Sequence, residues 1–425
     1  MTDKLSTQRS SRHQGRGFTL IELMVALSAG LFLSIFVFML TRDVSRFFQS
    51  ESRLSDATMG AVIGFERLKA DLTRAGFLAS PNLRMDPSRC PRTPTLTGGG
   101  WSGFPTLADM GLLYITRGAG GSTLQAAGAQ FLADNSLTPD HLRLYGNYQT
   151  ADQFPARSVT PPGAATVSIH LEPRSSAMIR LGYVPGASNA ESLIQAAFPV
   201  GRALRIVNAE GEQQYGIIQE ATINATTLAP VVTLNNSALN IVYESANKMC
   251  GIRGHGAGVS VNVVNIIDYR LDDALRASNA FIDLDLAANE DEARLDLVRE
   301  EINPQTGAAF EGSQQIVAEY AVDFRLGLTA VTNPATLALT RYAEGDELID
   351  NYAKAQAVPQ PNQGPHFIRA VRPRLSVRTR AADRTQNINP GPGLYRVALG
   401  SGRFARVRTL SATVATRNAQ GALWQ

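Results

Sequence analysis

The sequence predicts an α+β protein in which one long N-terminal helix is followed by a large antiparallel β-rich head. Three observations support this prediction. Residues 18–40 form an apolar run that contains one charged residue, Glu22, and no proline. Residues 46–77 continue with apolar side chains at helical spacing. Beyond residue 80 the chain changes to short segments in which apolar and polar residues alternate, as in half-buried antiparallel strands.

The apolar run is long enough to cross a membrane. A helix over residues 18–40 extends roughly 35 Å at ~1.5 Å per residue, and the hydrocarbon core of a bilayer is roughly 30 Å thick. The segment ahead of it is basic, with four cations against one carboxylate: Lys4, Arg9, Arg12, Arg16 and Asp3. The positive-inside rule therefore places residues 1–17 in the cytoplasm and the head on the far side of the membrane.

A secretory signal peptide and a plain signal anchor are simpler interpretations of the same run. A signal peptide would have a shorter apolar core and a small-residue cleavage site, whereas this run ends in the Thr-Arg-Asp of residues 41–43. A plain anchor does not explain Glu22, whose carboxylate costs about 2–3 kcal/mol within the span. Cleavage after Gly17 would give Phe18 a free amino group, with which Glu22 of the same or a neighbouring helix could pair.

The sequence Gly-Arg-Gly-Phe-Thr-Leu-Ile-Glu at residues 15–22, followed by an apolar helix, resembles the prepilin signature of type IV pilins and pseudopilins. The resemblance implies that a prepilin peptidase cuts after Gly17 and methylates the new amino terminus at Phe18. It also implies that Glu22 is the glutamate that directs filament assembly. Thr19, Leu20 and Leu23 fit the surrounding pattern.

Residues 46–77 predict an amphipathic continuation of the helix. Apolar side chains keep helical spacing and charged ones lie between them, namely Leu54, Ala61, Phe65, Leu68 and Leu72 against Arg53, Asp56, Glu66, Arg67, Lys69 and Asp71. Gly60 and Gly64 weaken this helix, and Gly76 and Pro81 mark its end. A separate helix after a linker is the alternative, but no proline-rich or serine-rich break interrupts the chain. One helix over residues 18–79 is therefore predicted, half transmembrane and half amphipathic.

Residues 80–258 are predicted to form a β-rich lobe or insertion. Strand-like runs separated by turn residues occur at 112–116, 141–145, 166–171, 203–207, 215–218 and 231–234. Cys90 and Cys250 bracket this region. In a chain exported to an oxidising space a disulfide between them is the default expectation, and two free buried thiols are the alternative.

Residues 259–425 are predicted to form an antiparallel sheet domain, with alternating strands near 261–271, 316–326, 371–380 and 410–414. Pro373 makes its strand a candidate for an edge or a strand start. Arg372, Arg374, Arg378 and Arg380 alternate with apolar residues, which predicts a solvent-exposed face or contact with an acidic partner.

Two stretches are similar to PilW-type minor pilins. Residues 65–77 look like the segment that closes their long helix, with the pattern L..DL..AG. The runs IIDYRLD, RLDLVREE, IVAEYAVDFRL, RAVRPRLSVRTR and VRTLSATVATRN occur in the order of their carboxy-terminal half. The resemblance covers residues 18–77 and 261–418. The large minor pseudopilin GspJ of type II secretion is the nearest other family.

We expect neither enzymatic activity nor a cofactor, because nucleophile, triad and metal-ligand patterns are lacking in the sequence. An acidic stretch invites a calcium interpretation, but its spacing lacks the usual register and a solvated loop fits better: Asp283, Asp285, Glu290, Asp291, Glu292, Asp296, Glu300 and Glu301. The formal net charge of +3 does not favour a nucleic-acid partner. We expect no small-molecule substrate.

The resemblance implies a minor pilin that primes type IV pilus assembly and sits at the pilus tip, with roles in adhesion and twitching motility. Its expected partners are other minor pilins, the major pilin, a PilY-type tip adhesin and the prepilin peptidase. The chain is expected in the bacterial inner membrane, as a single span with a periplasmic head, and then at the pilus tip on the cell surface. A GspJ-like pseudopilin and an anchored periplasmic binding module are the alternatives.

Overall fold

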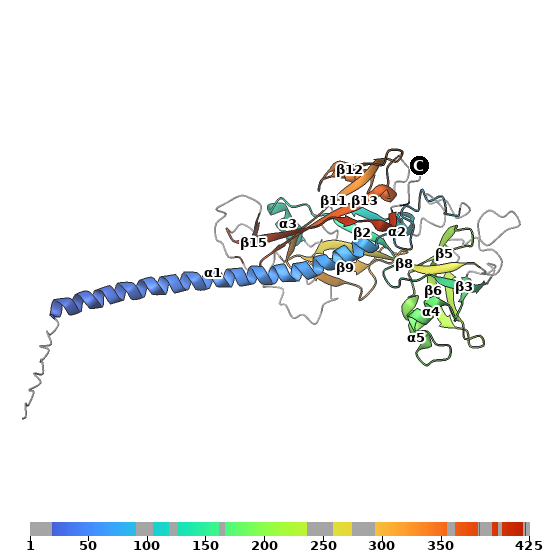
Figure 1. Cartoon of the computed structure of the whole chain (residues 1–425), viewed down its shortest axis with the longest axis horizontal. Helices are drawn as coiled ribbons and strands as arrows, with labels where there is room; N and C mark the ends of the chain where they lie inside the picture. The colour runs from blue at the N-terminus through green and yellow to red at the C-terminus, as the bar shows by residue number, and fades with distance from the viewer. Residues whose placement is uncertain are drawn as a thin grey trace, which may run out of the picture. The chain divides into compact units, whose positions relative to one another are not determined.

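The computed structural model describes residues 19–90, 105–118, 126–160, 166–235, 258–273, 294–354, 362–380, 382, 393–397, 402–419 and 421. The chain divides into two compact units, Met1–Arg53 and Leu54–Gln425. A helix, α1 (Leu20–Arg74), begins in the first unit and ends in the second, and antiparallel strands dominate the rest (Figure 1). The predicted α+β class, with a long apolar helix and a β-rich head, is confirmed.

Helix α1 runs for 55 residues because no proline interrupts it and its ends carry favourable charges. Glu22 lies in the first turn and Arg74 in the last, where each complements the helix dipole. The helix ends before the predicted limit of residue 79. Gly76 adopts a left-handed conformation, with φ of 73°, and its N–H donates to the carbonyl of Tyr145 at 2.7 Å, which turns the chain into the head.

The first sheet of the described head has ten strands in the order β1-β2-β8-β3-β4-β7-β6-β5, with β9 paired to β8 and β10 to β9. All of these pairs are antiparallel. The strands are β1 (Leu113–Thr116), β2 (His141–Gly146), β3 (Phe154–Val159), β4 (Thr166–Leu171), β5 (Ala203–Val207), β6 (Gln213–Ile223), β7 (Pro230–Asn235), β8 (Ser260–Asp272), β9 (Asp296–Glu301) and β10 (Gln315–Ala318).

Part of this sheet closes into a barrel. The first residues of β8 pair with β3 on one side and with β5 on the other, so the described strands β8, β3, β4, β7, β6 and β5 form a ring. Its apolar side chains pack with helices α4 (Ser176–Leu181) and α5 (Ala190–Ala197) (Figure 1). The rings of Phe154 and Phe198 meet edge to face in this core, 4.9 Å apart. The predicted boundary at residue 258 falls just before β8, which the barrel shares with the remaining sheet.

The second sheet has six strands among the described residues, in the order β12-β11-β13-β15-β14, with β16 paired to β13. They are β11 (Ala321–Asn333), β12 (Ala338–Tyr342), β13 (Ile368–Arg378), β14 (Leu394–Arg396), β15 (Phe404–Ser411) and β16 (Val414–Ala415). The described part also contains short helices: α2 (Pro105–Ala108), α3 (Ala126–Asp134) and the 3-10 helices η4 (Glu347–Asn351), η5 (Pro365–Phe367) and η6 (Arg417–Ala419).

The expectation that Pro373 marks an edge strand or a strand start is wrong. Strand β13 lies inside the sheet, between β11 and β15, and Pro373 is opposite Leu326 of β11. On its other side β16 pairs with Ala370 and Val371, and β15 pairs from Arg374 onward. Pro373 therefore lies at the gap between two partner strands, where a missing N–H interrupts the ladder least.

The amphipathic half of α1 packs into a hydrophobic core that both sheets share. Leu68 and Leu72 are completely buried there, together with Phe65. They belong to one hydrophobic cluster with apolar residues of β1, β2, β8 and β9 from the first sheet and of β11 and β13 from the second. Burial of each such leucine stabilises the fold by about 1.5–3 kcal/mol, so this half of the helix is part of the head's core.

Gly64 is needed for close packing of α1 against β10. A Cβ atom at this position would lie 1.9 Å from the carbonyl oxygen of Val317, whereas a Cβ at Gly60 would meet no atom within 4 Å. The two glycines therefore have different roles. Gly64 allows close backbone approach, while Gly60 only lowers helix propensity.

We predict that Gly64→Ala and Gly60→Ala change stability in opposite directions. Gly64→Ala should lower the free energy of unfolding by about 1–3 kcal/mol, because α1 must move away from β10. Gly60→Ala should raise it by up to about 1 kcal/mol, because alanine is the better helix former. Chemical denaturation of the detergent-solubilised full chain, followed by circular dichroism, measures both. Equal effects would contradict the assignment.

Candidate assembly site

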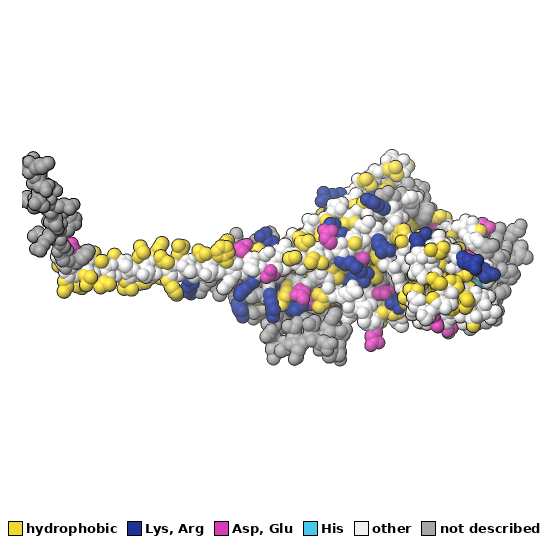
Figure 2. Space-filling model, turned by 60° about the horizontal axis from the view of Figure 1, so that its bottom comes forward, with side chains coloured by type: hydrophobic (Ala, Val, Ile, Leu, Met, Phe, Trp, Pro, Cys, Tyr) yellow, Lys and Arg dark blue, Asp and Glu magenta, His cyan; other side chains and the backbone are white. Residues whose placement is uncertain are grey.

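Residues 20–40 of α1 expose an almost wholly apolar surface. Helix α1 is the one helix in the described part that is long and apolar enough to cross a membrane. Figure 2 shows hydrophobic side chains covering this part of the helix. They include Leu20, Ile21, Leu23, Met24, Val25, Leu27, Leu31, Phe32, Leu33, Ile35, Phe36, Val37, Phe38, Met39 and Leu40.

The hydroxyl groups within this apolar segment are bonded to the helix itself. Ser28 donates to the carbonyl of Met24 at 2.9 Å, and Ser34 donates to that of Gly30 at 2.8 Å. Because each hydroxyl already has an acceptor, neither requires a partner from lipid or water. The segment is therefore compatible with a hydrocarbon environment despite its polar residues.

Thr19 and Glu22 form a reciprocal cap at the start of α1. The N–H of Thr19 donates to Glu22 Oε2 at 2.9 Å, and the Thr19 hydroxyl donates to the same oxygen at 3.0 Å. In return the N–H of Glu22 donates to the Thr19 hydroxyl oxygen at 3.2 Å. This is a capping box, in which threonine at the cap and glutamate three residues later satisfy free N–H groups of the first turn.

The capping box leaves half of the Glu22 carboxylate available. Within the described residues no group bonds Oε1 of Glu22, so this oxygen could accept a proton donor from outside the helix. The Thr-x-x-Glu spacing is the sequence signal for such a cap, and sequence reasoning missed it. Gly17 and Phe18 lie outside the described residues, so cleavage after Gly17 and methylation of Phe18 stay predictions.

At its other end α1 is fixed to the head by a buried carboxylate, Asp71. Its Oδ2 accepts from Arg299 Nε on β9 at 2.7 Å and from the Tyr269 hydroxyl on β8 at 2.8 Å. Burial and the charge of Asp71 raise the pKa of Tyr269, so its hydroxyl keeps the proton that it donates. Asp71 is only 5% exposed. The prediction that it lies on a charged outer face is therefore wrong.

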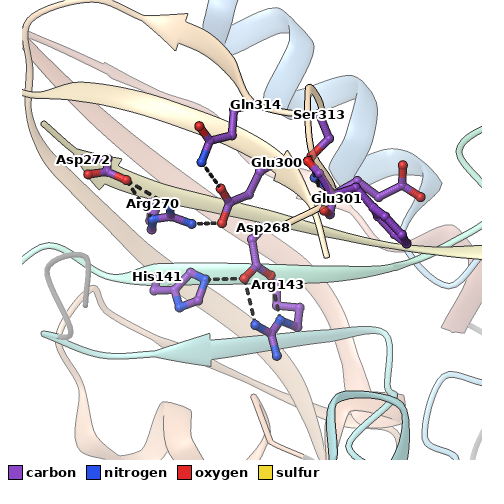
Figure 3. Close-up of polar contacts among 10 residues, drawn as sticks. His141, Arg143, Asp268, Arg270, Asp272, Glu300, Glu301, Ser313 and Gln314 are labelled. Carbon is purple, nitrogen blue, oxygen red and sulfur yellow. Dashed lines mark hydrogen bonds and ion pairs between the residues drawn. The ribbon is translucent and has the colours of Figure 1, made fainter. Parts of the chain in front are cut away.

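A second group of buried charges covers one face of β8 (Figure 3). Asp268 accepts from Arg143 Nε at 2.6 Å, and its Oδ2 lies 3.0 Å from His141 Nε2. Arg270 pairs with Asp272 at 2.9 Å and with Glu300 of β9. Burial alone would raise the pKa of Asp268, but the hydrogen bonds from Arg143 and His141 outweigh it and lower the pKa to about 2.

The acidic stretch of residues 283–301 lies only partly within the described residues. Asp296 and Glu300 are buried in β9, so for them the prediction of a solvated loop is wrong. Asp296 accepts from Arg294 and from the N–H of Tyr320, which explains its burial. Asp283, Asp285, Glu290, Asp291 and Glu292 lie outside. Among the residues that the structure describes, no group of three or more His, Cys, Asp or Glu side chains could hold a metal ion.

Of the four arginines in the predicted row, Arg372 and Arg378 are buried, whereas Arg380, beyond the end of β13, is exposed. Arg372 is 7% exposed, and Arg378 is completely buried with its guanidinium over the rings of Tyr320 and Tyr395. For these two the prediction of a solvent-exposed face is wrong. Arg374 is more exposed and pairs with Asp323 at 2.9 Å. The alternation in the sequence correctly placed these arginines on one face of β13. It did not reveal that aromatic and acidic groups of the head cover this face.

A cavity of about 370 Å³ opens beside Arg374, between α3 and strands β11, β13, β14 and β15. Asp323 at its wall accepts from both Arg374 and Arg325, at 2.9 and 3.3 Å. The hydroxyls of Ser376 and Thr409 bond to each other at 2.9 Å. These charged and polar groups are therefore already paired within the head.

Cys90 is completely buried and is not a free thiol. Its N–H donates to the carbonyl of Gln213 at 3.1 Å, beside the start of β6. Its predicted partner, Cys250, lies outside the described residues. The pairing of the two cysteines therefore stays a prediction.

Residues 12–38 match the family model of the prokaryotic N-terminal methylation motif. The matched segment contains Gly17, Phe18 and Glu22, and it covers the capping box and most of the apolar segment. No curated protein and no solved structure matches the chain significantly. The motif and the apolar helix support a type IV pilin-like protein, either a pilin or a pseudopilin. They also support processing by a prepilin peptidase, anchoring in a membrane and assembly with other pilins.

We predict that Asp268 makes the stability of the head depend on pH in the acid range. Its pKa is about 2 in the folded chain and about 3.9 in an unfolded one. The carboxylate therefore stabilises the fold fully above pH ~4 and loses its contribution as the pH falls toward ~2. The destabilisation caused by Asp268→Asn should shrink by about 2 kcal/mol over this interval. Denaturant unfolding at several pH values measures it.

Glu66→Gln is the matched control, because Glu66 is exposed and pairs only with Lys69 in the described structure. Its effect on the free energy of unfolding should stay small at every pH. A constant difference between wild type and Asp268→Asn from pH 4 to pH 2 would contradict the prediction.

Proposed function

We propose that the chain is a PilW-type minor pilin, which primes type IV pilus assembly and sits at the pilus tip. The observation that carries the proposal is the joining of a prepilin-type motif to an unusually large head. In a helical filament the N-terminal helices bundle centrally and the heads tile the outside. A head with two sheets, one of which closes partly into a barrel, is difficult to repeat along such a filament, whereas a few copies at the tip avoid this steric problem.

In the proposed mechanism, α1 joins the helices of other minor pilins in the inner membrane. The free oxygen of Glu22 pairs with the amino group of a processed neighbour, which lowers the cost of a carboxylate in lipid. The periplasmic heads then contact each other, the first major pilins and a PilY-type adhesin. Through this complex the chain would support adhesion and twitching motility. We propose a structural role in which the head catalyses no reaction and binds no cofactor, metal ion, nucleic acid or small substrate.

A GspJ-like pseudopilin of a type II secretion system is the second candidate, because the same motif occurs in pseudopilins. Both candidates require leader cleavage and helix association. They differ in the complex that contains the mature chain. Affinity purification from the native cell distinguishes them: minor pilins with a PilY-type protein favour the pilus, whereas secretion pseudopilins favour the alternative.

Processing can be tested at the cleavage site. Gly17→Leu should leave the full chain in the membrane with its leader attached, because a bulky side chain replaces the small residue before the cut. Intact-mass spectrometry of the purified protein measures this. The wild type should begin at Phe18 and carry an N-methyl group. An identical mature mass for the variant and the wild type would refute the prepilin assignment.

The charge of Glu22 can be separated from its role in the cap. Glu22→Gln keeps a side chain that can complete a capping box but removes the charge, whereas Glu22→Ala removes both. We expect both variants to insert normally and both to reduce co-purification with other pilins by at least about ten-fold, which corresponds to ~1.4 kcal/mol. Normal assembly of Glu22→Gln, with a defect only in Glu22→Ala, would show that the cap and not the charge matters.

A further inference from the structure

The hairpin between β11 and β12 ends in an exposed leucine that its backbone disfavours. Leu337 has φ of +54° and is 57% exposed. A leucine in this left-handed conformation is strained, because its Cβ approaches the following carbonyl oxygen. Residues held in strained conformations cluster at functional sites, so Leu337 is a candidate for a functional role.

The same turn sequence, Asn-x-x-Thr-x-Ala, occurs at three places in the described structure. Each turn places a left-handed residue at the same position. In each turn the asparagine side chain accepts from the N–H groups two and three residues later: Asn224 to Thr226 and Thr227, Asn303 to Gln305 and Thr306, Asn333 to Ala335 and Thr336. The fifth residue is left-handed in all three, as Leu228, Gly307 and Leu337. Gly307 is the unstrained solution.

Leu228 packs more closely against the head than Leu337, with 39% of its surface exposed against 57%. Leu228 lies over Gly186, where a Cβ would be 3.8 Å from its Cδ1, and its carbonyl accepts from the Tyr183 hydroxyl at 2.7 Å. Leu337 is the last residue of the turn before β12, and Leu339, on the strand itself, is 60% exposed. Two large apolar side chains are therefore exposed where the turn meets this short strand.

Strand β12 is also an open edge of the second sheet. In the described structure it pairs with β11 alone, and four of its five residues are exposed. The opposite edge, β14, is covered: Tyr395 is buried against α3, and Asn135 bonds to both the N–H and the carbonyl of Arg396. Natural edges are usually protected by charges or proline. Strand β12 carries one charge, Arg341, and no strand of the described part of the chain pairs with its outer side.

We propose that β12 accepts an added β-strand from another pilin-like subunit, with Leu337 and Leu339 as its apolar anchors. The geometry of an open edge favours an extended segment, because a row of edge N–H and C=O groups is matched in register by another extended backbone. The two leucines favour apolar residues in that segment. Glu344 and Glu347 follow β12 closely and favour a basic residue at the end of the added strand. That this strand comes from another pilin-like subunit rests on the proposed function.

The test is site-specific photo-crosslinking in the native cell, with benzoylphenylalanine in place of Ala338 of β12. We expect an adduct whose partner peptide comes from a protein with its own prepilin-type N-terminus. Benzoylphenylalanine in place of Gln305, an exposed residue of the glycine-containing turn, is the position control and should give less than a tenth of this adduct. An adduct with a second copy of this chain, or with a protein lacking a prepilin-type N-terminus, overturns the proposal, as does the absence of any adduct.

Variants of the edge make the test specific. Leu339→Lys places a charge on β12 and should reduce the adduct at least ten-fold, whereas Ile179→Lys, at an exposed apolar residue of α4, should change it less than two-fold. Leu337→Gly should also reduce the adduct while leaving the melting temperature of the full chain unchanged or higher. Equal effects of the two lysine variants, or a lower melting temperature for Leu337→Gly, overturn the proposal.

Leader processing separates this proposal from the proposed function. If the chain is cleaved at Phe18 but gives no adduct, strand addition is refuted and the prepilin role stands. If the leader is retained in the wild type, the prepilin role is refuted. An adduct at β12 would then show that the edge binds a partner of another class, which overturns the proposal that a pilin-like subunit supplies the strand.

Discussion

The buried contact of Asp71 with Arg299 and Tyr269 is the polar interaction that ties the end of α1 to the head. It fixes the last turns of α1 to two adjacent strands, β8 and β9, inside a core that leaves little freedom for movement. Loss of one partner of such a buried pair typically costs 3–5 kcal/mol, because the other charge stays buried without compensation. Leu68 and Leu72 contribute apolar burial, and the ion pair adds a specific polar contact at this end of the helix.

Strand β8 distributes that anchorage through the head. Its first residues close the barrel, and its later residues pair with β2 and β9 beside the helix. Its two faces also differ: Ile267, Tyr269 and Leu271 face the shared core, while Asp268 and Arg270 belong to the charged group on the other side. One strand thus connects the barrel, the helix and a polar layer, so none of the three can shift without disturbing β8.

Much of the architecture could be predicted from the sequence, because it depends on periodicity and length. The apolar run, its basic leader and the alternating strands identified the helix and the β-rich head. Pairings distant in the chain could not be predicted. Asp71 looked like a surface residue, since its partners Arg299 and Tyr269 are about 200 residues away in the sequence. Arg378 also looked exposed, because Tyr320 and Tyr395, whose rings cover it, come from other segments of the chain. At the candidate site Glu22 was identified from its motif, whereas its bond to Thr19 needed only local spacing and was still missed.

The way α1 enters the head has a mechanical consequence. A pull on the helix does not reach the sheets through the chain connection alone. Asp71 transmits part of the force to β8 and β9 through its bonds to Tyr269 and Arg299. The hydrogen bond from the N–H of Gly76 to the carbonyl of Tyr145 transmits another part to β2. Because three strands share the tension with the covalent link, no single hydrogen bond has to bear it. The head is attached to α1 at several separate points, and it should resist force along α1 better than its small number of polar contacts suggests.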